Sequence, residues 1–432
     1  MVGLAFAAMA INYIDRANLS VALPFMSHDL HISSGETGLI LGAFFWTYSI
    51  CQIPAGSLVD RFGARLTFAF AVAWWSVFTA ATVLVRGAGS LLGMRLLLGT
   101  GEAAAFPAAT KMVGDWFPVR ERALASGIYD SGARGGTLLS VPLVTALIAA
   151  LGWKGSFLVT GGLGLVWVAV WLLVYRDRPE THPRVNAQEL EHIQRDRTAD
   201  EGPAAKIGWR VLLRSRTVWG LGIGFACQAY VIYFFITWFP SYLVEDRGFD
   251  LLELGFLGTI PGIAGFVGSW LGGWLSDRIV ASGRYSLNVA RKGCIVVGMA
   301  LSAVVGLAGI TPEAWQALAL LSLAFAGVSF ATSSILAVPA DISPQGTGSV
   351  TGAVAGFQNA ISNLAGIVSP AAIGFLKDAT GTFVPGLLSA SGVALAGCLV
   401  YMFVVKRIEP GSLAEDVPEA AVAAAPEAAV RG

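Results

Sequence analysis

Six ionisable residues interrupt otherwise apolar stretches of the sequence, and they have the most chemistry to offer. They are Asp15, Arg16, Arg95, Glu102, Asp130 and Arg134. An ionisable group inside a membrane-spanning helix costs about 2.5–3.5 kcal/mol on insertion scales, so such residues are functional candidates. Three acids and three bases balance when all are ionised, and each carboxylate that takes up a proton leaves a positive charge that attracts an anion. The set predicts coupling between proton uptake and anion binding.

Helical spacing decides which of these groups can meet. Arg95 and Glu102 lie on nearly the same face of a helix but about 10 Å apart along its axis, so they cannot pair directly. Each needs a partner on another helix or a ligand. Asp15 and Arg16 are adjacent and point about 100° apart, so one can face a neighbouring helix while the other faces a cavity.

The second half of the chain offers neutral polar groups instead of charges. Gln228 and Tyr233 lie in one apolar stretch, and Asn359 and Asn363 lie one helical turn apart in another. Each amide carries donors and acceptors that suit hydroxyl recognition. The alternative is hydrogen bonding between helices beside small residues.

The composition places these residues in a lipid bilayer. The sequence is 55% hydrophobic and only 13% charged, whereas soluble proteins carry roughly 25% charged residues. So little charge excludes a soluble enzyme, and 28 basic against 28 acidic residues offer no basic patch to a nucleic acid. The cysteines are far apart and the histidines lie in polar connections, which predicts no metal site, no cofactor and no enzyme.

Twelve apolar stretches are long enough to span a bilayer, which takes about 20 residues. They run near 2–24, 37–58, 66–85, 89–112, 122–150, 153–175, 217–241, 251–275, 293–310, 314–338, 348–372 and 382–405. We therefore expect an all-α membrane protein with the domains 1–175 (six-helix half), 176–216 (cytoplasmic linker), 217–405 (six-helix half) and 406–432 (disordered cytoplasmic tail). No cleavable signal is visible, and we expect the natural start to lie upstream.

Positive charge predicts the orientation. With the N-terminus inside, the outer loops hold only Arg86, Lys154, Arg247 and Lys377, while the inner loops hold most of the Lys and Arg. Both termini are therefore predicted to be cytoplasmic. We expect a monomer in a bacterial inner membrane.

A G-x-x-x-D-R signal recurs at equivalent places in the two halves. The first copy comprises Gly56, Asp60, Arg61, Gly63 and Arg65, and the second contains Gly273, Asp277 and Arg278. This pattern resembles the major facilitator superfamily, whose inner loop between spans two and three carries it. The second copy lacks the glycine two residues after the arginine. We expect a conformational latch; the alternative is inner positive charge with a tight turn.

The pair Asp15–Arg16 combined with Arg95-x6-Glu102 resembles one branch of that superfamily, the anion:cation symporters, which includes bacterial sugar-acid transporters. The resemblance implies that Arg16 holds a substrate carboxylate. It also implies that the proton-coupling residues are Asp15, Glu102 and Arg95. With the neutral groups of the second half, the expected substrate-binding residues are Arg16, Tyr13, Tyr48, Arg134, Gln228, Tyr233, Asn359 and Asn363.

The fifth span departs from this branch. Sugar-acid members often carry a polar amide where this chain has Ala133. Two interpretations of Arg134 stay open: it binds a second carboxylate, which favours a diacid, or Asp130 one turn away satisfies it in a structural pair.

The expected function is proton-coupled symport of a small organic anion, such as galactonate, glucarate or a related hydroxy acid, by alternating access. The partners are then the anion, the proton and the bilayer. The alternatives are a carrier of aromatic or dicarboxylic acids with other coupling or exchange, and a drug:proton exporter. The aromatic residues Phe45, Trp46 and Tyr48 keep an aromatic acid open.

Overall fold

The computed structural model describes residues 1–118, 121–194, 213–342, 348–409 and 412. In this part of the chain the regular structure is helical throughout, which confirms the all-α prediction. The predicted tail 406–432 and part of the predicted linker 176–216 lie largely outside the described residues.

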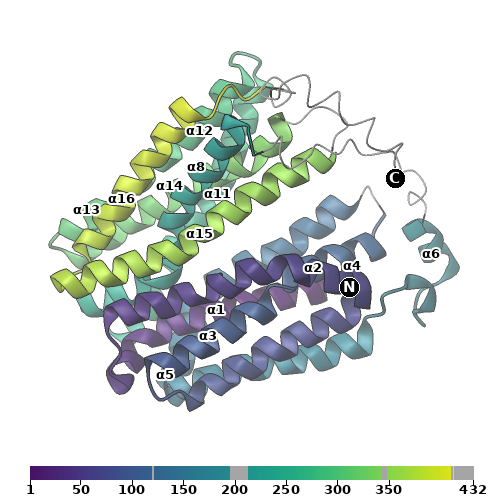
Figure 1. Cartoon of the computed structure of the whole chain (residues 1–432), viewed down its shortest axis with the longest axis horizontal. Helices are drawn as coiled ribbons and strands as arrows, with labels where there is room; N and C mark the ends of the chain where they lie inside the picture. The colour runs from purple at the N-terminus through teal and green to yellow at the C-terminus, as the bar shows by residue number, and fades with distance from the viewer. Residues whose placement is uncertain (119–120, 195–212, 343–347, 410–411, 413–432) are drawn as a thin grey trace. The chain divides into compact units, whose positions relative to one another are not determined.

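The helices follow the predicted spans closely (Figure 1). The first half contains α1 (Val2–Leu30), α2 (Ser34–Ala81), α3 (Ala88–Glu102), α4 (Ala105–Trp116), α5 (Arg122–Val174) and the short α6 (Ala187–Gln194). The second half contains α8 (Arg216–Thr237), α9 (Phe239–Ser241), α10 (Leu251–Leu257), α11 (Ile260–Ala281), α12 (Leu287–Ser302), α13 (Val305–Ile310), α14 (Ala314–Ile342), α15 (Gly348–Thr380) and α16 (Val384–Leu399).

Two of the long helices each contain two spans. α2 turns at Gly63 (φ 81°) and α5 at Gly152 (φ 71°), a left-handed backbone region that glycine adopts readily. Conversely, α3 and α4 together form the predicted fourth span. Eight helices of the described chain are long and apolar enough to cross a membrane. With α5 divided at its turn, and with α1, the start of α2 and the α3–α4 pair added, the twelve predicted spans are accounted for.

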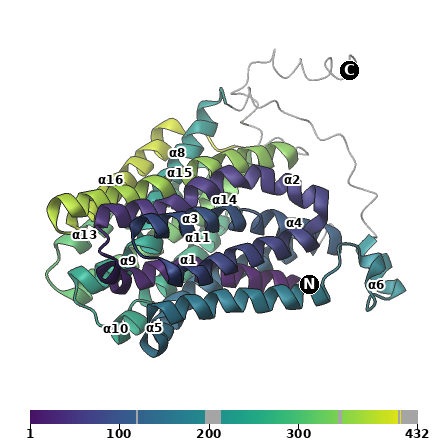
Figure 2. The same ribbon diagram turned by 60° about the horizontal axis from the view of Figure 1, so that its bottom comes forward.

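Residue contacts divide the chain into two compact units. The first comprises Met1–Glu201, Ile236–Thr259 and Pro370–Ala379, and the second comprises Gly202–Phe235, Ile260–Ser369 and Thr380–Gly432. In the first unit α1 lies along α5, and both views show them side by side (Figure 2). A Cβ at Gly132 or Gly136 would collide with the backbone oxygen of Phe6 or Ala10, so these glycines permit the close approach.

In the second unit α11 and α12 both pack on α14. Glycines again allow backbone contact, because a Cβ at Gly268 or Gly272 would strike the backbone of Ala326 or Phe330. Small residues at membrane-helix interfaces permit this close packing.

Candidate functional site

Arg16 and Glu102 form a buried ion pair between α1 and the end of α3. The Arg16 Nε and Glu102 Oε2 atoms lie 2.6 Å apart, and the side chains are 11% and 0% exposed. Glu102 therefore meets a partner on another helix, as its spacing from Arg95 required. The pair uses only part of each group: Arg16 Nη2 and Glu102 Oε1 are buried and have no hydrogen-bond partner in the described part of the protein.

Three aromatic rings surround the Arg16 guanidinium. Its Cζ atom lies 4.9 Å from the ring centroid of Tyr13, 4.7 Å from that of Phe44 and 4.8 Å from that of Tyr48. Each is within cation–π range. The predicted neighbours Tyr13 and Tyr48 are thus in place. Phe44 was missed, although its spacing of one helical turn from Tyr48 could have indicated it.

Arg95 lies over the same Phe44 ring as Arg16. Its Cζ atom lies 5.0 Å from the Phe44 ring centroid, and the residue is 5% exposed. Arg95 is in electrostatic contact with both Glu102 and Arg16. The two arginines thus lie over one phenylalanine ring, and one of them pairs with Glu102.

Glycines in the fourth span position Glu102. A Cβ at Gly99 would collide with the backbone oxygen of Phe44 and with the hydroxyl of Thr47, so α3 touches α2 directly at this point. The Thr47 hydroxyl donates to Leu96 O at 2.7 Å across the same contact. This close packing brings the end of α3 against the aromatic face of α2.

Asp15 points away from this pair, as the 100° offset from Arg16 predicts. Its carboxylate is buried, and neither oxygen has a hydrogen bond to another described residue. Its polar neighbours are Thr160 and Trp75, and Thr160 also accepts a hydrogen bond from Asn18 at 3.0 Å. Asp15 and Glu102 nevertheless interact electrostatically. Within the described residues no three His, Cys, Asp or Glu side chains gather as metal ligands.

Asp130 and Arg134 pair with each other on α5, with Nη2 and Oδ2 3.4 Å apart. Their side chains are 46% and 50% exposed, so these two residues are half-exposed rather than buried. Asp130 is near enough to Tyr13 for electrostatic contact.

The neutral polar groups of the second unit differ in exposure. Gln228 is fully buried and donates to Thr332 Oγ1 at 2.6 Å, while its Oε1 has no partner among the described residues. The Tyr233 hydroxyl lies 3.5 Å from Asn363 Oδ1. Asn363 is buried, whereas Asn359 is exposed.

The residues of the first G-x-x-x-D-R copy lie in two different surroundings. Gly56 and Asp60 line an open cavity of about 740 Å³ between α2 and α4, apart from the Arg16 cluster. The end of the motif is anchored locally instead: Arg65 N donates to Asp177 Oδ1 at 2.8 Å. A Cβ at Gly63 would lie 2.6 Å from that Asp177 carboxylate, which adds to the reason for glycine there. Arg61 lies over the ring of Phe62.

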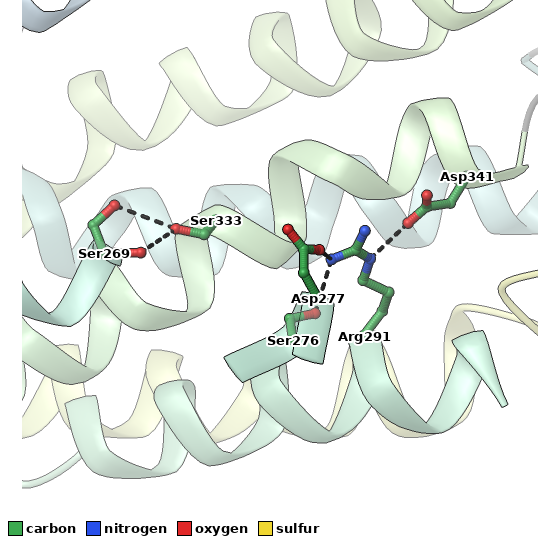
Figure 3. Close-up of polar contacts among 6 residues, drawn as sticks. All are labelled: Ser269, Ser276, Asp277, Arg291, Ser333 and Asp341. Atoms are coloured by element: carbon green, nitrogen blue, oxygen red, sulfur yellow. Dashed lines mark hydrogen bonds and ion pairs between the residues drawn. The ribbon is translucent and has the colours of Figure 1, made fainter. Parts of the chain in front are cut away.

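The second copy belongs to a cluster centred on Arg291 (Figure 3). The Arg291 guanidinium donates to Asp277 Oδ1 at 2.9 Å, Asp341 Oδ2 at 2.7 Å and Ser276 Oγ at 2.8 Å. These residues join α11, α12 and α14. Arg278 instead lies over the ring of Trp274. Motif spacing could not reveal Asp341, because it comes from a distant helix.

Comparison with known proteins identifies one family, and the relatives described here are all named as transporters. A family model described as Major Facilitator Superfamily matches residues 5–370. The chain is 35% identical to a D-galactonate transporter of Escherichia coli O6:H1 (94% of each chain covered) and 37% identical to a probable galactarate/D-glucarate transporter, GudP, of Escherichia coli K12 (94% and 93%). It is 36% identical to a probable sulfoacetate transporter, SauU, of Cupriavidus necator (91% and 90%).

A solved structure has the same fold. It is a bacterial homologue of the human lysosomal transporter Spinster in an inward-facing, unoccupied conformation, with a TM-score of 0.78, 18% identity, and coverage of 96% of this chain and 97% of that one. At this identity the likeness concerns the fold alone.

Proposed function

Because this chain belongs to the major facilitator superfamily, we propose that it is a proton-coupled symporter of a small organic anion, with sugar acids and related hydroxy acids as its substrates. The superfamily and the named relatives are transporters, which confirms that the chain is not an enzyme. Relatives named for galactonate, galactarate, glucarate and sulfoacetate all carry small anions, and this supports the substrate class.

The observation that carries the proposal is the incompletely used Arg16 guanidinium. Its Nε is paired with Glu102, whereas Nη2 is buried and without a partner among the described residues. A guanidinium binds a carboxylate through two parallel N–H bonds. The rings of Tyr13, Phe44 and Tyr48 fix its plane. Arg16 is therefore our candidate for the residue that binds the substrate carboxylate.

Charge balance supplies the coupling. The cluster of Arg16, Arg95, Asp15 and Glu102 is neutral when all four residues are ionised. A proton taken up by Glu102 removes the counter-charge of Arg16 and leaves an uncompensated cation for the substrate anion. By reciprocity, a bound anion favours the protonated carboxylate by the same factor. Asp15 serves as the second proton site, and Arg95 sets the electrostatic environment of Glu102.

The amides of the second unit are proposed to bind the substrate hydroxyls. Asn363 Nδ2 and Gln228 Oε1 are buried donor and acceptor atoms without partners among the described residues. One donates and the other accepts, which matches a hydroxyl group. Tyr233 and Asn359 complete this set. Alternating access between halves 1–175 and 217–405 then exposes the site to each side of a bacterial inner membrane, with both termini cytoplasmic and the protein a monomer.

Dicarboxylates are a second candidate substrate class, which the position of Arg134 favours. The contacts of Gly132 with Phe6 and of Gly136 with Ala10 show that α1 and α5 run in parallel register. Arg134 is therefore level with residue 8 of α1, about 12 Å along the helix axis from Arg16. The Arg134 guanidinium is paired with Asp130, one turn further from Arg16, so a diacid would have to draw this side chain away from Asp130 and toward Arg16 to be held at both ends.

The test is proton influx into proteoliposomes that contain a pH-sensitive dye. We expect internal acidification when one sugar acid is added outside and none with its neutral analogue. A panel of monoacids, diacids and aromatic acids then names the substrate class. Binding of an acid without proton influx would contradict the coupling. The absence of both binding and proton influx across the panel would contradict the anion site.

A further inference from the structure

The first unit contains a contact between chain segments that are far apart in the sequence, at the start of α2. The N-terminal cap of this helix has two parts. Ser33 and Glu36 form a reciprocal capping box, in which Ser33 Oγ accepts from Glu36 N at 3.2 Å and Glu36 Oε2 accepts from Ser33 N at 2.9 Å. A helix N-terminus leaves its first N–H groups without intrahelical acceptors. The box satisfies the N–H groups of Ser33 and Glu36, but not those of Ser34 and Gly35 between them.

Asp378, near the end of α15, supplies the rest of the cap. Its Oδ1 accepts from Ser34 N at 2.9 Å and its Oδ2 from Gly35 N at 2.6 Å. A carboxylate at this position forms charge-assisted hydrogen bonds and complements the positive end of the helix dipole. This cap is not local, since its acceptor lies more than 340 residues away in the sequence.

The backbones of α2 and α15 touch beside this cap. A Cβ at Gly38 would collide with Pro370 O, and a Cβ at Gly374 would collide with Ser34 O. Trp238 strengthens the contact, because its Nε1 donates to the same Pro370 oxygen at 3.0 Å. Lys377 pairs with Glu245 and lies over the Trp238 ring.

By the predicted orientation, the Asp378 cap lies on the outer side of the membrane. We propose that Asp378 is a releasable outer latch: its carboxylate holds the N-terminus of α2 while the outer side is closed and leaves it when the outer side opens. This inference rests on the proposed alternating-access transport. A cap donated by a distant segment suits such a role, because it can be broken without unfolding either helix.

The test uses electron-spin distance measurements on the full chain in liposomes. Spin labels are placed at His31→Cys and Ala379→Cys, both exposed, after replacement of the four native cysteines. Asp378→Asn removes the charge at constant shape. We expect the ratio of long to short label distances to rise about tenfold, as the loss of a hydrogen bond to a charged group implies.

Asp250→Asn is the matched control. Asp250 caps α10 through Glu253 N at 2.8 Å, on the same predicted side, but within its own chain segment. We expect no change in the distance distribution with this variant. Gly38→Ala provides a second route: its Cβ would press on Pro370 O and should raise the long-distance population with the charge intact.

Unchanged distances in both Asp378→Asn and Gly38→Ala would overturn the latch. The spin measurement requires no substrate, so it separates this inference from the proposed transport. A distance shift in a protein that moves no anion would retain the latch and reject the symport. Proton-coupled uptake with unchanged label distances would retain the symport and reject the latch.

Discussion

At Arg16, one guanidinium meets one carboxylate and three aromatic rings. This arrangement makes demands that a lysine cannot meet, because an ammonium has no planar fork to stack on rings and to bind two oxygens in parallel. The Nε–Oε2 bond to Glu102 uses one N–H of the guanidinium, and Nη2, which shares an edge with Nε, has no partner among the described residues. Substrate recognition at this site should therefore depend on shape as well as charge.

Arg16→Lys tests this dependence. We expect kcat/KM for anion uptake to fall about 10- to 100-fold, since a hydrogen bond to a charged group is at stake although the charge remains. Arg247→Lys is the control, because Arg247 also lies over a tyrosine ring, that of Tyr242. Its uptake should stay within about twofold of the parent. Equal loss in both variants, or none in Arg16→Lys, would exclude Arg16 as the carboxylate-binding residue.

Glu102→Gln separates proton coupling from anion binding. Glutamine keeps the side-chain shape and an oxygen that accepts from Arg16 Nε, but it cannot gain or lose a proton. We expect proton-driven accumulation of the anion to disappear while exchange of internal for external anion continues. Radiolabel uptake and counterflow in the same proteoliposomes measure the two activities. Asp130→Asn, on a half-exposed pair, should retain both; coupling that survives Glu102→Gln would assign the proton to another residue.

At the scale of helices, the packing of α3 on α2 determines where Glu102 lies. Apolar runs and charge spacing were enough to predict the fourth span and the shared face of Arg95 and Glu102. They could not predict that Phe44 lies against both arginines, because that contact depends on the tertiary approach of two helices. The cluster of Arg291, Asp277 and Asp341 was missed for the same reason, since its members come from three helices.

Gly99→Val tests the helix contact. Its Cβ would collide with the backbone of Phe44, and such overpacking costs about 1–3 kcal/mol. We expect a lower unfolding temperature of the purified protein and weaker anion uptake, because α2 and its aromatic rings must move. Gly93→Val, on the same helix, is the control, since a Cβ there meets no atom within 4 Å. Equal effects at both positions would point to general helix disruption instead.

Asp341→Asn tests the Arg291 cluster. The Asp341 and Arg291 side chains are 19% and 12% exposed, so their bond is shielded from water. We expect the free energy of unfolding to fall by about 1–3 kcal/mol. Asp277→Asn should cost less than about 1 kcal/mol, because the Asp277 side chain is 73% exposed. Thermal unfolding of the purified variants gives the order, and the reverse order would show that burial does not set their contributions.

At the scale of the whole molecule, sequence patterns predicted the fold better than its connections. The twelve spans followed from apolar length alone, because a bilayer demands it. The sequence separated spans 37–58 and 66–85, and the structure divides α2 between them at Gly63, whose backbone is not helical (φ 81°). The partner of the turn, Asp177, lies at the end of a later span, where motif spacing does not reach.

Coupling between proton and anion also has a consequence for the stability of the whole protein. A ligand that binds only the folded state stabilises it by about 2.7 kcal/mol at 100 times its dissociation constant. Since protonation is proposed to favour anion binding, the apparent affinity should rise as the pH falls. We expect the sugar acid that the protein transports to raise the unfolding temperature more at about pH 5.5 than at about pH 8. Arg16→Gln should abolish the shift at both, while Glu102→Gln should reduce its dependence on pH; an equal shift at every pH in the parent protein would mean that anion binding is not linked to a proton.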